Sequence, residues 1–212
     1  LNVDKAVNLD NANDDYNKLE ISNSSVENNN TMSGTQAGQV AMAQENIYSP
    51  FDINWVTLTN NGTINLSGAN STGMYAKSGV ITNKSNITVG DSGTGIYGID
   101  NSKISNTGTI TIGSNSTGLY YDDARNSTVT TTGMTNNGTI KSAGNNSVGM
   151  SYNHIGPNVT TFENVGTIEL TGDKNTGMYA TGNPGYNTVN SGTIKMGNSA
   201  SLNNPNVALY TS

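Results

Sequence analysis

A pattern that recurs along most of the chain restricts its fold more than any other feature of the sequence. Five copies read Asn-x-Gly-Thr-Ile and a sixth reads Asn-Lys-Ser-Asn-Ile. The anchor isoleucines of these copies, 23, 23, 30, 28 and 26 residues apart, are Ile64, Ile87, Ile110, Ile140, Ile168 and Ile194. The asparagines four residues before them are Asn60, Asn83, Asn106, Asn136, Asn164 and Asn190. Self-similarity at such a period is typical of solenoids, in which each repeat is one coil.

Two further blocks complete each repeat. A Thr-Gly-x-Tyr block follows the anchor, with its second residue eight or nine positions on in the first five copies. An apolar block precedes the Asn in five of the six copies, with its key residue two positions earlier: Leu58, Ile81, Ile104, Met134 and Phe162. Each block alternates apolar and polar residues, which is the signature of a strand, and no helical period appears. Three short strands per coil predict an all-β, three-sided parallel β-helix of about seven coils.

This fold also suits a composition that would not build an ordinary core. Leu, Ile, Val and Phe account for only 39 of 212 residues, whereas Asn alone accounts for 36 and charged residues for 11%. A solenoid needs few inward side chains per coil, for example Ile81, Ile87, Val89, Thr94 and Ile96. We expect the Asn column to occupy a sharp corner in left-handed conformation and to form a hydrogen-bonded ladder, with positive φ at the Gly two residues on.

The regularity differs along the chain. Residues 58–212 form the regular coils, and residues 1–57 are degenerate coils with an excursion at 44–57. One unit is visible there, from Val26 through Met32 to Ala37-Gly38. The whole is expected to be one continuous solenoid. Because the chain starts with Leu1 and stops within a repeat, we expect it to be cut from a longer protein.

Charge and composition exclude several classes of protein. The net charge is −6 and the nine Lys and Arg residues form no cluster, so nucleic acid is not an expected partner. No apolar run approaches the length of a membrane-spanning helix. The chain has no Cys, so disulfide scaffolds and zinc fingers are excluded, and no cofactor is expected.

The units Asn-x-Gly-Thr-Ile and Thr-Gly-Met-Tyr-Ala resemble the passenger repeats of large type V autotransporter adhesins, particularly the long fusobacterial outer-membrane adhesins. The resemblance is strong over residues 58–212 and weak over 19–57. It implies a right-handed parallel β-helix displayed outside a bacterial cell and anchored in the outer membrane by a C-terminal β-barrel that this chain does not include. It also implies a host-cell or bacterial surface glycan or protein as the partner, and a role in attachment and virulence.

Catalytic groups are sparse. His154 is the only histidine, and the acidic residues are scattered apart from the adjacent Asp122 and Asp123, whose side chains should point apart. A polysaccharide-active enzyme of the β-helix kind is therefore the least favoured of the functions considered. A calcium site at Asp122-Asp123 is weighed against the simpler interpretation of two solvated acids on a turn.

Two features are candidates for contact with a partner. The first is a column of tyrosines expected to face outward: Tyr75, Tyr97, Tyr120, Tyr179 and Tyr210. It is interrupted by Ser151, and it serves either as a binding surface or as a ring ladder that stabilises the sheet. The second is a set of longer loops at 121–130, 152–160 and 181–187. They follow the Thr-Gly-x-Tyr block in three consecutive coils and bring together Asp122, Asp123, Arg125, Tyr152, His154, Pro157, Pro184 and Tyr186.

Loops on a rigid scaffold often carry recognition, although drift in a repeat would also produce them. The sequence therefore predicts a non-catalytic, surface-displayed adhesin segment. The alternative is a passive stalk whose parent binds elsewhere. End-to-end self-association of the fragment is also expected, because a coil cut at either end leaves an unpaired strand edge.

Overall fold

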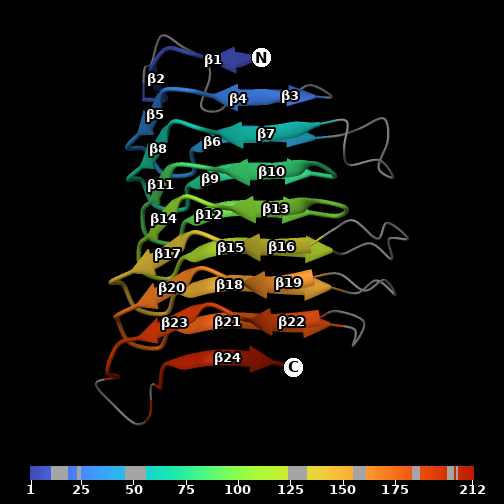
Figure 1. Cartoon of the computed structure of the whole chain (residues 1–212). Coiled ribbons are helices and arrows are strands. Elements are labelled where there is room, and N and C mark those ends of the chain that lie inside the picture. The colour runs from blue at the N-terminus through green and yellow to red at the C-terminus, as the bar shows by residue number, and fades with distance from the viewer. Residues whose placement is uncertain are drawn as a thin grey trace.

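The computed structural model describes residues 1–10, 19–22, 25–45, 56–123, 133–154, 161–182, 187–199, 203 and 205–212. In this part of the chain there is no helix, and strands wind coil after coil around one axis from the N-terminus to the C-terminus (Figure 1). In particular, the described residues include no helix long and apolar enough to cross a membrane.

Three parallel sheets form the three sides of the solenoid, each with eight strands. Sheet A consists of β1 (Asn2–Val3), β4 (Val26–Asn28), β7 (Thr57–Asn60), β10 (Val80–Asn83), β13 (Lys103–Asn106), β16 (Gly133–Asn136), β19 (Thr161–Asn164) and β22 (Asn187–Asn190). Sheet B consists of β2 (Val7–Asn8), β5 (Thr31–Gly34), β8 (Thr63–Leu66), β11 (Asn86–Val89), β14 (Thr109–Ile112), β17 (Thr139–Ser142), β20 (Thr167–Leu170) and β23 (Thr193–Met196). Sheet C consists of β3 (Leu19–Ser22), β6 (Val40–Glu45), β9 (Thr72–Lys77), β12 (Thr94–Ile99), β15 (Thr117–Asp123), β18 (Val148–His154), β21 (Thr176–Gly182) and β24 (Val207–Thr211).

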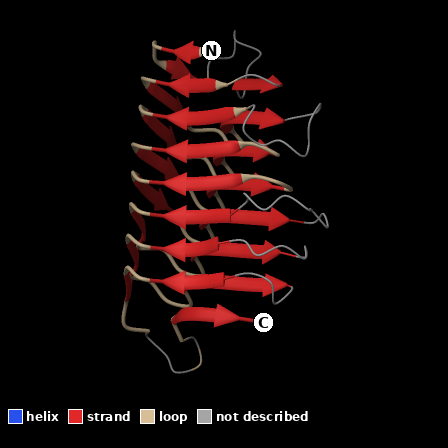
Figure 2. Ribbon diagram, turned by 45° about the vertical axis from the view of Figure 1, so that its right-hand side comes forward, coloured by secondary structure: helices blue, strands red, loops and turns tan. Residues whose placement is uncertain are grey.

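The solenoid is right-handed. In Figure 2 the front strands run to the left, the darker strands behind them run to the right, and the chain descends from N to C. Right-handed crossovers between parallel strands are the rule for L-amino acids. The predicted three-sided parallel β-helix is therefore confirmed. The structure has eight strands per sheet because the first 22 residues already supply one coil.

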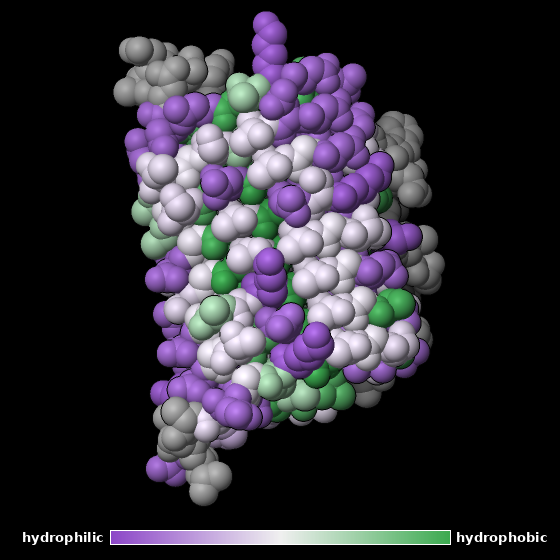
Figure 3. All heavy atoms as spheres, turned by 60° about the vertical axis from the view of Figure 1, so that its left-hand side comes forward, coloured by the Kyte–Doolittle hydropathy of each residue, from purple (hydrophilic) through white to green (hydrophobic). Residues whose placement is uncertain are grey.

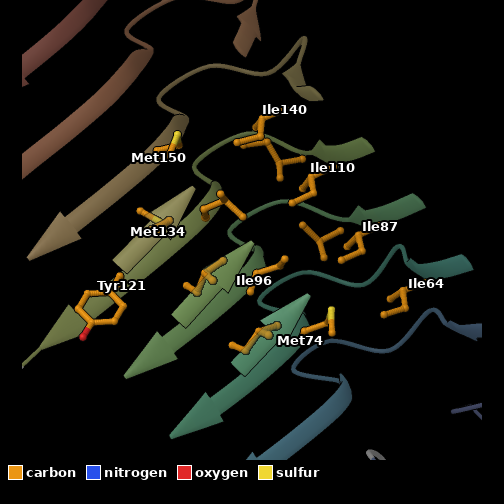
Figure 4. Packing of buried hydrophobic residues seen from close by; sticks show 14 of the residues in the cluster. Ile64, Met74, Ile87, Ile96, Ile110, Tyr121, Met134, Ile140 and Met150 are labelled. Atoms are coloured by element: carbon orange, nitrogen blue, oxygen red, sulfur yellow. The ribbon is translucent and has the colours of Figure 1, made fainter. Parts of the chain in front are cut away.

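The register stacks equivalent residues of successive coils. Ile110 pairs with Ile87 on one side and with Ile140 on the other, as the repeat predicted. These side chains are fully buried, and Figure 4 shows them as one column with Ile64, facing methionines and isoleucines from the other sheets. Because equivalent residues stack on one another, one inward-facing side chain at each of these positions per coil is enough to form a continuous core.

The N-terminal part joins the same three sheets. Val26 pairs with Leu58 and Met32 with Ile64, so the unit visible in the sequence is real. Its third strand, however, aligns Val40 with Thr72, so the assignment of this block to Ala37-Gly38 is wrong. Gly38 instead lies at the corner just before that strand, with a φ of 76°. Of the excursion expected at 44–57, residues 46–55 lie outside the described residues.

The corner between sheets A and B, here called the AB corner, carries the Asn ladder. Each Asn donates from Nδ2 to Oδ1 of the Asn in the next coil, at 2.7–2.8 Å, from Asn28 through to Asn190. The first six members are fully buried, and Asn190 is exposed. Buried amides are tolerated here because every interior member has a ladder partner on both sides, and Oδ1 of the first member, Asn28, accepts from the backbone N–H of Asn30.

The expected backbone conformation of the AB corner is wrong. Among the described residues, positive φ does not occur in the ladder or at the glycines that follow it. These glycines are needed for close approach: a Cβ on Gly108 would lie 2.0 Å from the carbonyl oxygen of Ser85 in the preceding coil, and one on Gly166 would lie equally close to that of Gly138.

The left-handed conformation occurs instead mainly at the corner between sheets B and C, here called the BC corner, and also at Ser78 and Asp100 between sheets C and A. Two residues before the third strand of each of six coils, φ lies between 55° and 76°, at Gly38, Asn70, Ser92, Asn115, Asn146 and Lys174. The corner therefore tolerates several residue types, since a single left-handed residue costs only about 1–2 kcal/mol.

The Gly of the Thr-Gly-x-Tyr block interrupts the in–out alternation of the third strand. In β12, Thr94 is only partly buried, so its predicted place in the core is wrong, while Gly95 and Ile96 both face inward. A Cβ on Gly95 would lie 2.6 Å from Cγ2 of Ile110, so a side chain has no room. The ring of the following Tyr consequently returns to the outer face.

Candidate functional site

The three longer loops leave the rod at one corner, between sheet C and the next strand of sheet A, here called the CA corner. Asp122 of β15, Asn153 of β18 and Thr181 of β21 are in register, as are Gly133, Thr161 and Asn187 where the chain re-enters sheet A. The ends of the three loops are therefore stacked, one strand spacing apart.

The strands extend further into the predicted loops than expected. They end at Asp123, His154 and Gly182, so the first residues of all three predicted loops belong to sheet C. Asp123 and His154 are backbone neighbours in the register. Their side chains lie outside the part of the structure that is described, as do Arg125, Pro157, Pro184 and Tyr186.

Tyr152 is not a loop residue, and its assignment to a ligand-contact loop is wrong. It is fully buried, and its ring stacks on Tyr121 at 5.0 Å and on Phe162 at 5.1 Å. The Tyr121 hydroxyl donates to the carbonyl oxygen of Asp100. Tyr121 and Tyr152 occupy an inward position that holds only Ala76 and Gly98 in the two 23-residue coils and Ala180 in the coil of β21.

The sequence contained the signal for this buried stack. Leu119 faces inward and Tyr120 outward, so strict alternation places Tyr121 inward, and the same holds for Met150, Ser151 and Tyr152.

Asp122 lies on the outer face of sheet C within a chain of hydrogen bonds. Asn153 donates from Nδ2 to Oδ1 of Asp122 at 2.9 Å, and Thr181 donates from its hydroxyl to Oδ1 of Asn153 at 3.3 Å. No group of three or more His, Cys, Asp or Glu residues that could hold a metal ion occurs among the described residues. Asp122, Asn153 and Thr181 thus form a row of linked hydrogen-bonding groups across three neighbouring strands.

The Tyr column runs down the same face of sheet C. Tyr75 and Tyr97 meet edge to face at 5.5 Å, Tyr97 stacks on Tyr120 at 4.9 Å, and Tyr179 stacks on Tyr210 at 5.2 Å. All but Tyr210 are partly buried, so the column is less exposed than expected; Tyr210 is 45% exposed. The rings therefore pack on one another while keeping an edge in solvent.

The environment of the column disfavours tyrosinate. Burial, followed by the charge of Glu45, raises the pKa of Tyr75 to about 12. Burial also raises the pKa of Tyr97 and of Tyr120, and the charge of Asp122 adds to the effect at both. The column is thus apolar and bordered by negative charge.

A shallow hollow that was not expected from the sequence lies on sheet B. It has a volume of about 330 Å³ and is lined by Thr111, Lys141, Ser142, Ala143, Glu169 and Thr171. Figure 3 shows this face of the rod as mostly residues of intermediate hydropathy, with a few strongly hydrophilic ones and hydrophobic atoms visible between them. Its Lys and Glu have opposite charges and solvated surroundings, and they do not indicate a particular ligand.

Comparison of the chain with family models, with curated proteins and with solved structures finds no match in any of the three. What the chain does must therefore be inferred from its own residues and geometry.

Proposed function

We propose that the chain is a non-catalytic adhesin segment, displayed on a bacterial cell surface, that makes an attachment contact through the CA corner of a rigid β-helix. The observation that carries the proposal is the stacking of three consecutive insertions at one corner, with their ends in register. A rigid scaffold that presents variable loops is a common arrangement for recognition. The resemblance of the repeats to autotransporter passengers supports the setting.

A passive stalk is the second candidate. It is favoured by the unbroken Asn ladder from Asn28 to Asn190, which is a feature of a spacer whose purpose is length and stiffness. A spacer does not require insertions, however, and two of the regular coils have none. A variant with altered loops can therefore distinguish the adhesive function from the passive stalk.

Beads coated with the purified chain would test the proposal by their attachment to cultured epithelial cells. The comparison variant replaces residues 124–132, 155–160 and 183–186 with Gly-Ser runs of equal length, which leaves Tyr121 and Tyr152 in the core. We expect beads carrying the native chain to attach and beads carrying the variant to attach no better than albumin-coated ones. Equal attachment of beads carrying the native chain and beads carrying the variant would exclude the loops as the contact surface. If neither kind of bead attaches, the passive stalk is the function that remains.

A further inference from the structure

The Tyr column has one interruption, in the coil of β18. Ser151 pairs with Tyr120 of the coil before and with Tyr179 of the coil after, at the position where a ring would continue the stack. Within the described part of the chain, the ring of Tyr120 contacts only the ring of Tyr97, and that of Tyr179 contacts only that of Tyr210. The rings of Tyr120 and Tyr179 therefore each have one face without an aromatic neighbour, and Ser151 lies between these two faces.

The width of this interruption suits one flat group. Neighbouring rings of the column lie 4.9–5.5 Å apart. Two strand spacings separate Tyr120 from Tyr179, on the order of 10 Å. A ring inserted above Ser151 would thus meet an aromatic face on each side at an ordinary stacking distance.

Polar groups line one side of the interruption. Asp122, Asn153 and Thr181 follow Tyr120, Ser151 and Tyr179 by two residues on their strands, so they lie on the same face of sheet C. They are linked to one another by hydrogen bonds, in which Asp122 accepts through Oδ1. Oδ2 of Asp122 and the hydroxyl of Ser151 take no part in this chain of bonds, so both can bond to a ligand.

We propose that this interruption, termed the Ser151 gap, binds one neutral pyranose ring of a surface glycan. The C–H faces of a sugar ring suit the electron-rich faces of Tyr120 and Tyr179, and its hydroxyls suit Ser151, Asp122 and Asn153. A phenyl ring would use the two faces and leave the polar groups without a role. Anionic sugars are disfavoured by the negative charge of Asp122.

Ser151→Tyr is the decisive variant, because it fills the gap with the residue that most other coils already carry. The matched control is Tyr75→Ser, which makes the opposite exchange at the far end of the same column. Saturation-transfer NMR with lactose, methyl α-mannoside and N-acetylglucosamine on the purified chain would measure binding, and glucuronate would test the effect of charge. Thermal melting of each variant would establish that it folds.

We expect the native chain to bind at least one neutral sugar with millimolar affinity and glucuronate more weakly. Ser151→Tyr should weaken binding about ten-fold or more, because the new ring would occupy the gap and cover the faces of Tyr120 and Tyr179 that the ligand uses. Tyr75→Ser should leave binding within about two-fold, because Tyr75 lies three coils from Ser151. Tyr120→Leu, which keeps apolar bulk and removes the flat face, should also lose binding and serves as the second variant if Ser151→Tyr does not fold.

Absence of neutral-sugar binding to the native chain, or equal binding to Ser151→Tyr, would overturn the inference. Gap-dependent binding of a tyrosine-containing peptide in place of sugars would do the same and would identify a protein partner. The inference rests on the proposed adhesive function, but its test uses no cells. Cell attachment without sugar binding would overturn the sugar site alone, whereas sugar binding without attachment would overturn the proposed function.

Discussion

Polar side chains inside the rod decide much of its behaviour at the scale of single residues. Asn83, Asn106 and Asn136 are fully buried amides whose partners are amides of the same kind in neighbouring coils. Gln44 is also fully buried, but among the described residues neither its Nε2 nor its Oε1 has a partner. The same chemical group therefore stabilises one position and costs stability at another, depending on what stands next to it.

Replacing Asn106 with Ala should destabilise the fold by about 1–3 kcal/mol, since it leaves buried amide groups of two neighbours without this partner. Urea unfolding followed by circular dichroism would measure the change. Asn190→Ala is the matched control: this last ladder member is exposed, so water can replace its lost bond. Equal losses for the two variants would contradict the role assigned to burial.

Replacing Gln44 with Met should raise the stability by about 1 kcal/mol or more, because a side chain of similar length removes two unsatisfied polar atoms. Gln39→Met should act in the opposite direction, since Nε2 of Gln39 donates to the carbonyl oxygen of Leu9 and to Oδ1 of Asp10. Melting temperatures of the two variants would check the opposite signs. A fall for Gln44→Met would show that its amide has a partner in solution.

At the scale of the strand, the direction in which a residue points determines the effect of changing it. Thr109 and Thr111 lie on the outer face of β14, and Ile110 and Ile112 lie on the inner face. In β12, Gly95 shifts this alternation by one residue, which returns the ring of Tyr97 to the outer face of sheet C.

Ile110→Asp should cost several kcal/mol, because it places a charge in a dry column between Ile87 and Ile140. Thr111→Asp, one residue further along the strand and facing outward, should change the stability by less than about 1 kcal/mol. Denaturant midpoints compare the two. A variant Ile110→Asp that unfolds at the same midpoint as Thr111→Asp would show that the register is wrong.

The Tyr column should make stability depend on pH in the alkaline range. The unfolded-state pKa of Tyr is about 10, and Tyr75 has a pKa of about 12 in the folded chain. A group whose pKa is raised by folding contributes fully below the unfolded value, and the contribution is lost as the pH rises through the folded value. The melting temperature should therefore fall between about pH 10 and 12.

Phenylalanine at positions 75, 97 and 120 removes three ionisable groups of the column and keeps the rings, so the variant should lose the part of this dependence that these three residues contribute. Tyrosinate absorbance recorded during the titration would show whether ionisation and unfolding coincide. A native chain that melts at one temperature throughout this range would contradict the shifted pKa values.

Most of the strand pattern could be predicted from the sequence, because alternation and a stacked register are local properties. Ile110 illustrates this: its neighbours follow from the repeat alone. The AB-corner glycines could not be interpreted correctly, because positive φ and close approach to another coil both demand Gly. Only the folded structure shows that Gly108 faces a carbonyl oxygen of the coil before it.

The candidate site was predicted less well than the fold. The sequence brought together Asp122 and its neighbours at one corner, but the positions of strand ends decide which of them face solvent. β18 runs to His154, and this places Tyr152 in the core. The hydrogen bonds that join Asp122, Asn153 and Thr181 depend on cross-strand register in a region of unequal coil lengths, which the repeat does not specify.

At the scale of the whole molecule, each coil contacts chiefly its two neighbours, so insertions at one corner need not disturb the stack. The 30-residue spacing between Ile110 and Ile140 leaves their pairing the same as in the 23-residue coils. Solenoids are close to one-dimensional in this sense, with stability summed over coils and their interfaces.

Replacement of residues 124–132, 155–160 and 183–186 with Gly-Ser runs of equal length should therefore change the melting temperature by no more than about 4 °C, as expected for a loss near 1 kcal/mol or less. Scanning calorimetry of the variant against the native chain checks this. A loss of cooperativity, or a much larger drop, would mean that the loops contribute to the stack.

The Asn ladder has a direction, because every amide donates toward the C-terminal end of the rod. No single interior member can turn over without setting donor against donor on one side and acceptor against acceptor on the other. The row must therefore keep or reverse its orientation as a unit, and its aligned dipoles polarise one another. Each coil that adds to the C-terminal end of the stack must therefore present its Asn with Oδ1 toward the last Nδ2 of the row, and its own Nδ2 is then directed toward the coil that follows.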